Sequence, residues 1–319
     1  MRASTWRVIV SSAAVVALAV GATGCSSSSK TVTSSARKTS AHADGTRHFA
    51  FNSDADQSLA LSLGFDVMDV TGSGSHPRRT KAIVDSLPRG VQALIWVGNM
   101  DNTNCDAPDY TTAEFRALVD AMARDRKVYG YYIADEPHPL TCRDAVADIR
   151  ARAEYLHAHS RFEKAFIVIQ DGVGPCGSTL GCEFAALQPS KSGVDLIGVD
   201  PYPCHYGAGG EFVPCDDGLI RDRVAAAIAN GIPASVIVPL FQTFGQAGRV
   251  GGDVYYRMPT PSELNAILAT WDRLVAHPVL DAAYTFGVEC STTCPAPQAL
   301  VNHPELQAAV RAHNARNSS

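Results

Sequence analysis

The pattern that decides the fold lies in residues 128–171, which read VYGYYIADEPHPLTCRDAVADIRARAEYLHAHSRFEKAFIVIQD. Two short apolar segments, 128–136 and 165–171, are rich in β-branched and aromatic residues and flank an amphipathic stretch, 143–159. Near-continuous apolar runs are typical of parallel strands that helices cover on both faces. This segment therefore predicts a strand, a helix and a second strand parallel to the first.

The same alternation continues in both directions along the chain. Further strands are predicted at 48–52, 65–71, 93–99, 195–202, 235–244 and 282–289, and further helices at 55–64, 79–87, 112–125, 220–230 and 261–276. Only the segment after the fifth strand, 183–193, is weak as a helix. Eight strands with intervening helices over about 270 residues predict one (β/α)8 TIM barrel. A doubly wound open sheet is the alternative, although no glycine-rich fingerprint follows the first strand.

Helix starts carry local signals as well. Three pairs have the spacing of capping boxes, in which a side chain at the helix start and a glutamate three residues later bond reciprocally. The series Asn52-x-Asp54-x-Asp56 resembles the start of a calcium loop, but Leu63 stands at its twelfth position, where glutamate is needed. We therefore expect a helix cap there. The three capping-box pairs are Thr111 with Glu114, Thr260 with Glu263, and Asn302 with Glu305.

Composition narrows the class of protein. The chain has 319 residues, of which 46% are hydrophobic, and this content suits a sizeable core and excludes a disordered chain. A net charge of −5 argues against a nucleic-acid partner, which would require a basic face. Nine cysteines are too many for a reducing compartment unless they bind metal, and the odd number leaves one without an intramolecular partner.

The N-terminus accounts for the odd cysteine. Arginines flank a short apolar run that ends at Ala22-Thr23-Gly24-Cys25, and this ending resembles the lipobox of bacterial lipoproteins. The resemblance implies a signal peptide over 1–24, acylation of Cys25 and a place on the extracytoplasmic face of the cell membrane. Residues 25–45 are Ser/Thr-rich and predict a flexible tether, so that 46–319 form the barrel domain. Ordinary secretion with a chance cysteine is the alternative.

The other eight cysteines follow the predicted strands. All of them fall on the side of the strand carboxyl ends, and pairing by proximity predicts bridges that fix the loops of that face. Zinc is the rival interpretation, because Cys204-His205 and Cys290-x-x-x-Cys294 resemble ligand pairs, but export and the absence of paired C-x-x-C motifs argue against it. The predicted pairs are Cys105–Cys142, Cys176–Cys182, Cys204–Cys215 and Cys290–Cys294.

Polar residues gather at the same strand ends, where the active sites of such barrels lie. The residues in question are Asn52, Asp54, Asp69, Asn99, Asp101, Asp135, Glu136, Gln170, Asp171, Asp200, Tyr202, Gln242 and Glu289. Aromatic faces suit stacking on sugar rings, and this property adds further candidates for substrate contact. The aromatic candidates are Trp96, Tyr202, Phe241, Phe244, Tyr255 and Tyr256.

The segment GYYIADEP, residues 130–137, resembles the fourth-strand motif of clan A glycoside hydrolases, in which Asn-Glu-Pro presents the general acid/base glutamate. The resemblance implies that Glu136 is the general acid/base and that Asp135, in place of asparagine, modulates it. Pro137 favours an extended Glu136 at the strand end. By parity Glu136 shares a strand face with Tyr132 and Ala134. A carboxylate pair that caps the next helix is the alternative.

IGVDPYP, residues 197–203, resembles the sixth strand of related barrels, where Asp200 and Tyr202 would face the sugar; a structural role for both is the alternative. The family carries a nucleophilic glutamate at the end of the seventh strand, and this chain has Gln242 there. An amide cannot form a glycosyl ester, so the retaining two-glutamate mechanism does not carry over. Asp200 or Glu289 could supply the second carboxylate, an N-acetyl sugar could supply its own nucleophile, or the barrel could bind glycan without cleaving it.

The sequence thus predicts a surface lipoprotein that resembles glycoside hydrolases. It would hydrolyse an extracellular polysaccharide or cell-wall glycan as a monomer without a cofactor or metal, and it would meet the membrane only through its anchor. Its catalytic candidates are Glu136, Asp135, Asp200 and Glu289. Its candidates for substrate contact are Asn52, Asp69, Asn99, Trp96, Gln170, Tyr202, Gln242, Tyr255 and Tyr256. A non-catalytic glycan-binding or structural envelope lipoprotein on a degenerate barrel is the alternative.

Overall fold

The computed structural model describes residues 45–98, 105, 110–170, 180–207, 209–245, 256–288 and 298–318. Eight parallel strands close into a barrel in which the first strand, β1, is hydrogen-bonded to the last, β9. This closure confirms the (β/α)8 TIM barrel and excludes the open doubly wound sheet. The barrel strands are β1 (Arg47–Ala50), β2 (Val67–Thr71), β3 (Gln92–Trp96), β4 (Val128–Asp135), β5 (Lys164–Ile169), β6 (Leu196–Val199), β7 (Ile237–Gln242) and β9 (Leu280–Tyr284).

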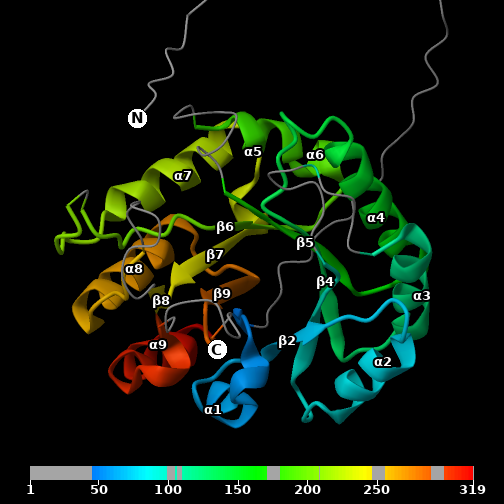
Figure 1. The fold of residues 1–319 in the computed structure, drawn as a ribbon, viewed down its shortest axis with the longest axis horizontal. Helices are drawn as coiled ribbons and strands as arrows, with labels where there is room; N and C mark the ends of the chain where they lie inside the picture. The colour runs from blue at the N-terminus through cyan, green and yellow to red at the C-terminus, as the bar shows by residue number, and fades with distance from the viewer. Residues whose placement is uncertain are drawn as a thin grey trace, which may run out of the picture. The chain divides into compact units, whose positions relative to one another are not determined.

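The helices lie around the outside of the barrel (Figure 1). The weak segment after β5 forms two short helices, α5 and α6, in place of one long one. In the ranges that the structure describes, no helix combines the length and the apolar character needed to cross a bilayer. The helices are α1 (Gln57–Ser62), α2 (Pro77–Ser86), α3 (Thr112–Met122), α4 (Ala145–His159), α5 (Cys182–Leu187), α6 (Pro189–Ser192), α7 (Asp217–Ala229), α8 (Pro261–Leu274) and α9 (Pro304–Asn317).

Short elements complete the fold. The strands β8 (Phe244–Gly245) and β10 (Gln298–Ala299) pair antiparallel outside the barrel, and the sequence did not predict this pair. The 3-10 turns are η1 (Ser53–Ala55), η3 (Ala234–Val236) and η4 (Leu300–Asn302).

Two of the three predicted capping boxes are present. Thr111 with Glu114 and Thr260 with Glu263 form both reciprocal bonds, at the starts of α3 and α8. The third prediction is wrong, because α9 begins after His303, whose ring bonds to the Glu305 carboxylate, and no side chain caps the helix. Elsewhere, the Asp56 carboxylate accepts from the Leu59 amide at the start of α1, as expected for a cap in place of a calcium loop.

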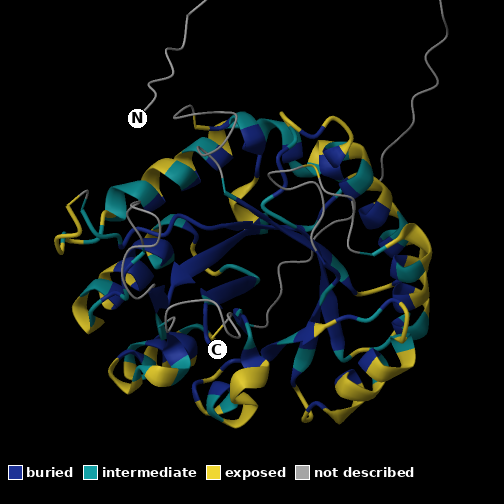
Figure 2. Ribbon diagram, in the orientation of Figure 1, coloured by how far each residue is buried: buried dark blue, intermediate teal, exposed yellow. Residues whose placement is uncertain are grey.

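The barrel strands are mainly buried (Figure 2), and the buried side chains form two clusters. One cluster fills the barrel with side chains from alternate strand positions, such as Phe49, Phe166 and Leu240, and the other lies between the strands and the helices. Gly198 shows how tightly the inner layer is packed, because a Cβ there would approach Leu240 to 2.8 Å and Phe166 to 3.1 Å. This packing makes the barrel interior solid, so a ligand has access only at the ends of the strands.

The strand β4 contains an irregularity that the sequence did not reveal. Its register with β5 shifts between Tyr132 and Ala134, so Tyr132 belongs to the inner cluster and Ala134 to the outer one. After the shift, the Tyr132 hydroxyl donates to the carboxylate of Asp135. The predicted shared face of Tyr132, Ala134 and Glu136 is therefore wrong, because the bulge breaks the two-residue period.

At the opposite end of the barrel, a buried network joins the first strand, the last strand and α9. The His48 ring lies 2.7 Å from one Asp281 oxygen, and the His313 ring lies 2.9 Å from the other. The second ring nitrogen of His48 lies 3.1 Å from the Asn314 carbonyl oxygen. The ligand atoms of His48, Asp281 and His313 all lie within 4.8 Å of one another. Hydrogen bonds already join the rings of His48 and His313 to the Asp281 carboxylate. We therefore interpret the cluster as a structural network that joins β1, β9 and α9 where the barrel closes.

Candidate active site

Glu136 follows β4 directly, at the carboxyl end of the barrel. Its backbone has φ 42°, in the left-handed region, so the extended conformation expected before Pro137 is wrong. The amide of Glu136 still donates to the Val168 carbonyl oxygen at 3.2 Å, which keeps the residue attached to β5. Non-glycine residues in this region carry strain of about 1–3 kcal/mol and cluster at functional sites.

The Glu136 carboxylate is fixed by a neighbouring strand. The side-chain amide of Gln170, the residue after β5, donates to Glu136 Oε1 at 3.0 Å. Gln170 was expected to contact substrate, and the structure shows that it orients the central carboxylate of the site. It is half-buried.

Asp200, the residue after β6, lies within hydrogen-bond reach of the Glu136 carboxyl group. Its side chain is buried. Burial raises the pKa of Asp200 well above its ordinary value, and the negative charge of Glu136, the bond to it and the charge of Asp135 raise it further. Two ionised carboxylates in contact repel each other, so this arrangement favours a single proton held by the pair.

Aromatic rings surround the acid pair. Tyr202 stacks on Tyr284 with ring centroids 5.5 Å apart and meets Tyr256 edge-on at 5.3 Å. Trp96, at the end of β3, packs on Tyr132 at 4.6 Å. Burial raises the pKa of Tyr256 to about 12, with further contributions from the charges of the acid pair. These phenols are therefore neutral hydrogen-bonding groups at physiological pH. The sequence did not single out Tyr132 and Tyr284, although strand parity places them with Trp96 and Tyr202 inside the barrel.

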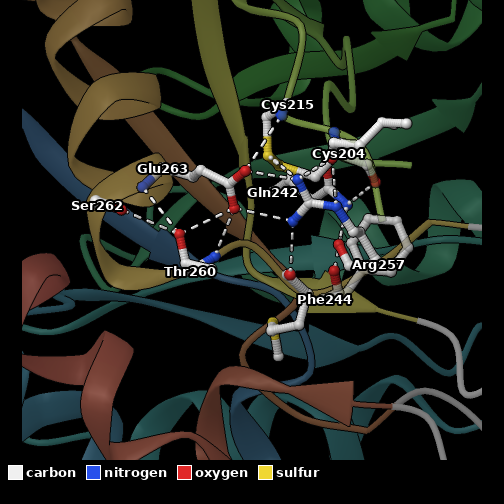
Figure 3. Close-up of a disulfide and its surroundings, with 10 residues drawn as sticks. Cys204, Cys215, Gln242, Phe244, Arg257, Thr260, Ser262 and Glu263 are labelled. Carbon is white, nitrogen blue, oxygen red and sulfur yellow. Dashed lines mark hydrogen bonds and ion pairs between the residues drawn. A yellow bond between two sulfur atoms is a disulfide. The ribbon is translucent and has the colours of Figure 1, made fainter. Parts of the chain in front are cut away.

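Gln242 is the last residue of β7, the position at which the sequence resemblance predicted a nucleophilic glutamate. It is fully buried, and its side-chain oxygen accepts from the Cys204 amide at 2.9 Å. Its side-chain nitrogen donates to the carbonyl oxygens of Cys204, Phe244 and Arg257 at 3.1, 3.3 and 3.0 Å. The amide thus binds three backbone segments together and has no polar atom directed at a ligand (Figure 3). We assign Gln242 a positioning role in place of the expected substrate contact.

Arg257 extends the same network. It is 1% exposed, its guanidinium donates to both Glu263 oxygens at 2.6 and 2.9 Å, and it also bonds to the Val213 carbonyl oxygen. Burial favours a neutral Glu263, but the bonds from Arg257 and Thr260 prevail and lower the pKa of Glu263 to about 2. The loop after β6 is therefore anchored to α8 through a buried ion pair beside the disulfide (Figure 3).

Two predicted disulfides are present. Cys105–Cys142 joins the loops after β3 and β4, and Cys204–Cys215 closes the loop after β6. Cys182 is also disulfide-bonded, while Cys176 lies outside the described residues. The bridge to Cys215 leaves Cys204 no thiolate, which contradicts a zinc site with His205. Cys25, Cys290 and Cys294 also lie outside the described residues.

Asn52 and Asp69 connect strand ends. The Asp69 carboxylate accepts from the Asn52 amide at 3.0 Å, and the Asn52 side chain donates to the Thr285 hydroxyl at 2.9 Å. Phe241 is directed to the outer core, where it packs on His313, so it does not face the barrel mouth. The expected site residues that lie outside the described residues are Asn99, Tyr255 and Glu289, together with Asp101 and Asp171.

The sequence also missed a buried hydrogen bond two residues after Glu136. His138, two residues further along the chain, lies 2.9 Å from the carboxylate of Glu183 on α5, and both side chains are buried. This contact connects the segment that follows β4 to α5. The sequence feature that could have indicated this contact is His138 itself, which directly follows Glu136-Pro137.

Comparison with known proteins places the fold. No protein-family model matches the chain, and no curated protein matches it. Among solved structures, a chitinase from Chromobacterium violaceum has a TM-score of 0.51 and 13% identity, covering 84% of this chain and 98% of that chain. A GH18 chitinase from Cycas revoluta in complex with (GlcNAc)3 has a TM-score of 0.53 and 12% identity, covering 86% and 100%.

An endo-β-1,4-glucanase from Xanthomonas axonopodis pv. citri is similar to the same degree, with a TM-score of 0.55, 10% identity and coverage of 86% and 99%. At this level of identity the likeness shows the fold. The class of protein that the structure defines is a TIM barrel with an acid pair and an aromatic lining at the carboxyl ends of its strands.

Proposed function

We propose that the protein is a surface-anchored glycoside hydrolase that acts on an extracellular polysaccharide containing N-acetylated sugars. The observation that carries the proposal is the contact between Glu136 and the buried carboxyl group of Asp200, whose pKa burial and the charge of Glu136 raise well above its ordinary value. A carboxylic acid with a raised pKa is what protonation of a glycosidic oxygen requires.

The geometry favours one of the three mechanisms left open by the sequence. Carboxyls that share a hydrogen bond are closer than the about 5–5.5 Å of a retaining pair or the about 6.5–9.5 Å of an inverting pair. Asp200 is therefore a partner of Glu136 and not a second group across the scissile bond. Gln242 cannot replace it, because that side chain is buried and bonded to the backbone. A nucleophile supplied by the substrate fits this arrangement.

In the proposed reaction, Glu136 donates the shared proton to the glycosidic oxygen while the acetamido oxygen of the sugar attacks the anomeric carbon. The leaving sugar departs as an alcohol, and the acetamido group closes to an oxazolinium ring. Water then attacks the anomeric carbon, gives its proton to the Glu136 carboxylate, and the acetamido group reforms. Tyr202, Tyr256 and Tyr284 line the site with apolar faces and polar tips suited to a pyranose.

The solved structures lend support of a general kind. Two of the similar barrels are named as chitinases, one of them in complex with (GlcNAc)3, and another is named as an endo-β-1,4-glucanase. If Glu289 supplies a second carboxylate, a sugar without an acetamido group becomes a substrate. If neither route operates, the barrel binds glycan without cleaving it.

The test is hydrolysis of chitohexaose, cellohexaose and mannohexaose by the wild type and by Glu136→Gln, with Glu154→Gln as the control. Glu154 is an exposed glutamate on α4 that pairs with Arg150. We expect turnover of chitohexaose, a loss of about 10²–10⁴-fold in Glu136→Gln and no change in the control. Equal turnover by wild type and Glu136→Gln would exclude the proposed acid. Turnover of cellohexaose that Glu289→Gln abolishes would favour the second carboxylate, and binding without turnover would favour the non-catalytic alternative.

We also propose that Cys25 is acylated and holds the barrel at the extracytoplasmic face of the cell membrane. The lipobox-like ending of the apolar run supports this localisation. Cys25→Ser should move the protein from the detergent phase to the aqueous phase in a phase-partition assay of bacterial membranes. Partition of both forms into the aqueous phase would contradict the anchor.

A further inference from the structure

A group of basic side chains lies at the end of the barrel opposite the acid pair. Arg47 begins β1, Arg89 precedes β3, and Arg126 and Lys127 precede β4, so all four belong to the amino-terminal ends of parallel strands. Together with three neighbouring residues they line a depression of about 420 Å³. We call this surface the basic face.

The cations of the basic face differ in whether they already pair with or donate to neighbouring groups. Arg47 pairs with Asp66 at 2.9 Å, and Lys127 donates to two backbone carbonyl oxygens. Arg89 and Arg126 are exposed, and neither forms an ion pair with any residue that the structure describes. The nearby acids Asp85 and Asp125 are engaged by Lys81. These groups comprise five cations, Arg47, Lys81, Arg89, Arg126 and Lys127, and three acids, Asp66, Asp85 and Asp125, so their summed charge is positive although the whole chain carries −5.

An exposed aromatic ring adjoins these cations. Phe162, two residues before β5, is 52% exposed. The guanidinium carbons of Arg126 and Arg161 lie 6.0 and 5.6 Å from its ring centroid. An exposed aromatic ring beside guanidinium groups is typical of surfaces that sit in the headgroup region of a bilayer, where the ring enters the interface and the cations meet phosphates.

The basic face is also the end at which the chain enters the barrel. The Thr46 amide donates to the Asn317 carbonyl oxygen at 2.8 Å, one residue before Arg47 begins β1. About 20 residues separate Thr46 from Cys25, and if this Ser/Thr-rich stretch is the tether that its composition predicts, its root-mean-square span is about 25 Å. An anchor at Cys25 would therefore hold this end of the barrel within reach of the membrane surface.

We propose that the basic face docks on anionic phospholipid. Arg89 and Arg126 bind headgroup phosphates, Phe162 enters the interface, and the end of the barrel that carries Glu136 then points away from the membrane. A single-point anchor would leave the barrel free to rotate, and the negative net charge would repel it from an anionic surface. The basic face supplies a second contact and sets the orientation. The orientation rests on the proposed anchoring and function, whereas the lipid binding rests on neither.

The test measures co-sedimentation of the Cys25→Ser chain with vesicles, so that no acyl chain contributes. One set of vesicles contains phosphatidylglycerol and phosphatidylcholine in equal parts, and the other contains phosphatidylcholine alone. The variant Arg89→Glu/Arg126→Glu is compared with Arg78→Glu/Arg79→Glu, which makes the same change in charge. Arg78 and Arg79 are exposed at the start of α2, at the opposite end of the barrel.

We expect binding to the phosphatidylglycerol vesicles alone, weaker at about 0.5 M than at about 0.1 M salt. Each basic residue near an anionic surface contributes about five-fold, so the loss of two predicts at least about 25-fold weaker binding. The Arg78/Arg79 variant should keep wild-type binding. Equal losses in the two variants, or equal binding to both vesicle types, would overturn the proposal, and so would equally strong binding of glycerol phosphate in solution. None of these readouts depends on glycan hydrolysis, so failure of the proposed function would be seen separately.

Discussion

The substitution Asp200→Asn should stabilise the folded protein at neutral pH while it impairs catalysis. In the unfolded chain Asp200 ionises near its ordinary pKa of 3.8, whereas in the folded protein burial and the charge of Glu136 raise the pKa well above that value. The folded state therefore binds more protons than the unfolded state above pH 3.8. Stability must fall as the pH rises through this window, because the carboxyl group is increasingly penalised for remaining in the buried site.

The size of the effect follows from the linkage. Each unit of difference between the folded and unfolded pKa contributes about 1.4 kcal/mol to the pH dependence of unfolding. For a domain of this size 1 kcal/mol corresponds to about 2–4 °C, so one unit predicts about 3–5 °C in the unfolding temperature. Asparagine keeps the shape of the protonated acid and cannot ionise, so the gain should appear at neutral pH and vanish below about pH 4.

The assay is thermal unfolding of the wild type and the variant from about pH 3 to about pH 8. Asp281→Asn is the matched control, because Asp281 is equally buried but bonds to two histidine rings that lower its pKa against the effect of burial. That variant should lose stability where Asp200→Asn gains it. An unfolding temperature of Asp200→Asn that lies below the wild type at pH about 8, or a gap that does not change with pH, would refute the reasoning.

Three other substitutions test the scaffold. Gln242→Glu places a negative charge against three carbonyl oxygens. The free energy of unfolding measured in urea should fall by about 3 kcal/mol or more, and the new carboxylate should not act as a nucleophile. An increase in activity would contradict the buried position of this side chain. Arg257→Met removes the charged partner of Glu263, which keeps its bonds to Thr260 and Cys215, and should cost about 3 kcal/mol. The stability that the wild type loses between pH 4.5 and about 2 should be smaller in the variant. Burial lowers the pKa of His48, but the contact with Asp281 raises it overall. The stability that this pair contributes should therefore fall as the pH rises above 6.5. A His48→Gln variant whose stability changes with alkaline pH as the wild type does would exclude the charged pair.

The strands were predictable because each is buried on both faces. A segment such as 164–169 has almost no polar residue to interrupt it, and its apolar run marks the strand whatever its neighbours are. The short pair formed by residues 244–245 and 298–299 has no such signal, because two residues carry no periodicity and the partners lie far apart in the chain.

The candidate site was predictable in its membership but not in its geometry. Asp200 and Glu136 follow two apolar strands, so their place at the barrel mouth could be read directly from the order of residues. The contact between the two side chains could not be predicted from the sequence, because it depends on the bulge in β4 and on the left-handed backbone of Glu136. Both features arise from pairing with β5, and a rule based on the residue before proline acts only on local sterics.

Two energetically unfavourable features, a strained backbone and a buried acid, lie at the ends of β4 and β6. Their position argues that the reaction takes place at these two strand ends. Glu136 occupies a strained backbone region, and the Asp200 carboxyl beside it is buried next to a second acid. Each feature lowers the stability of the fold, and the barrel itself closes through the pairing of β1 with β9. At the end of β7 the opposite holds, because every polar atom of Gln242 is bonded to the backbone. A strained backbone and two acids in direct contact are retained where a reaction uses them. We therefore expect both Glu136→Gln and Asp200→Asn to lose activity while both variants still fold.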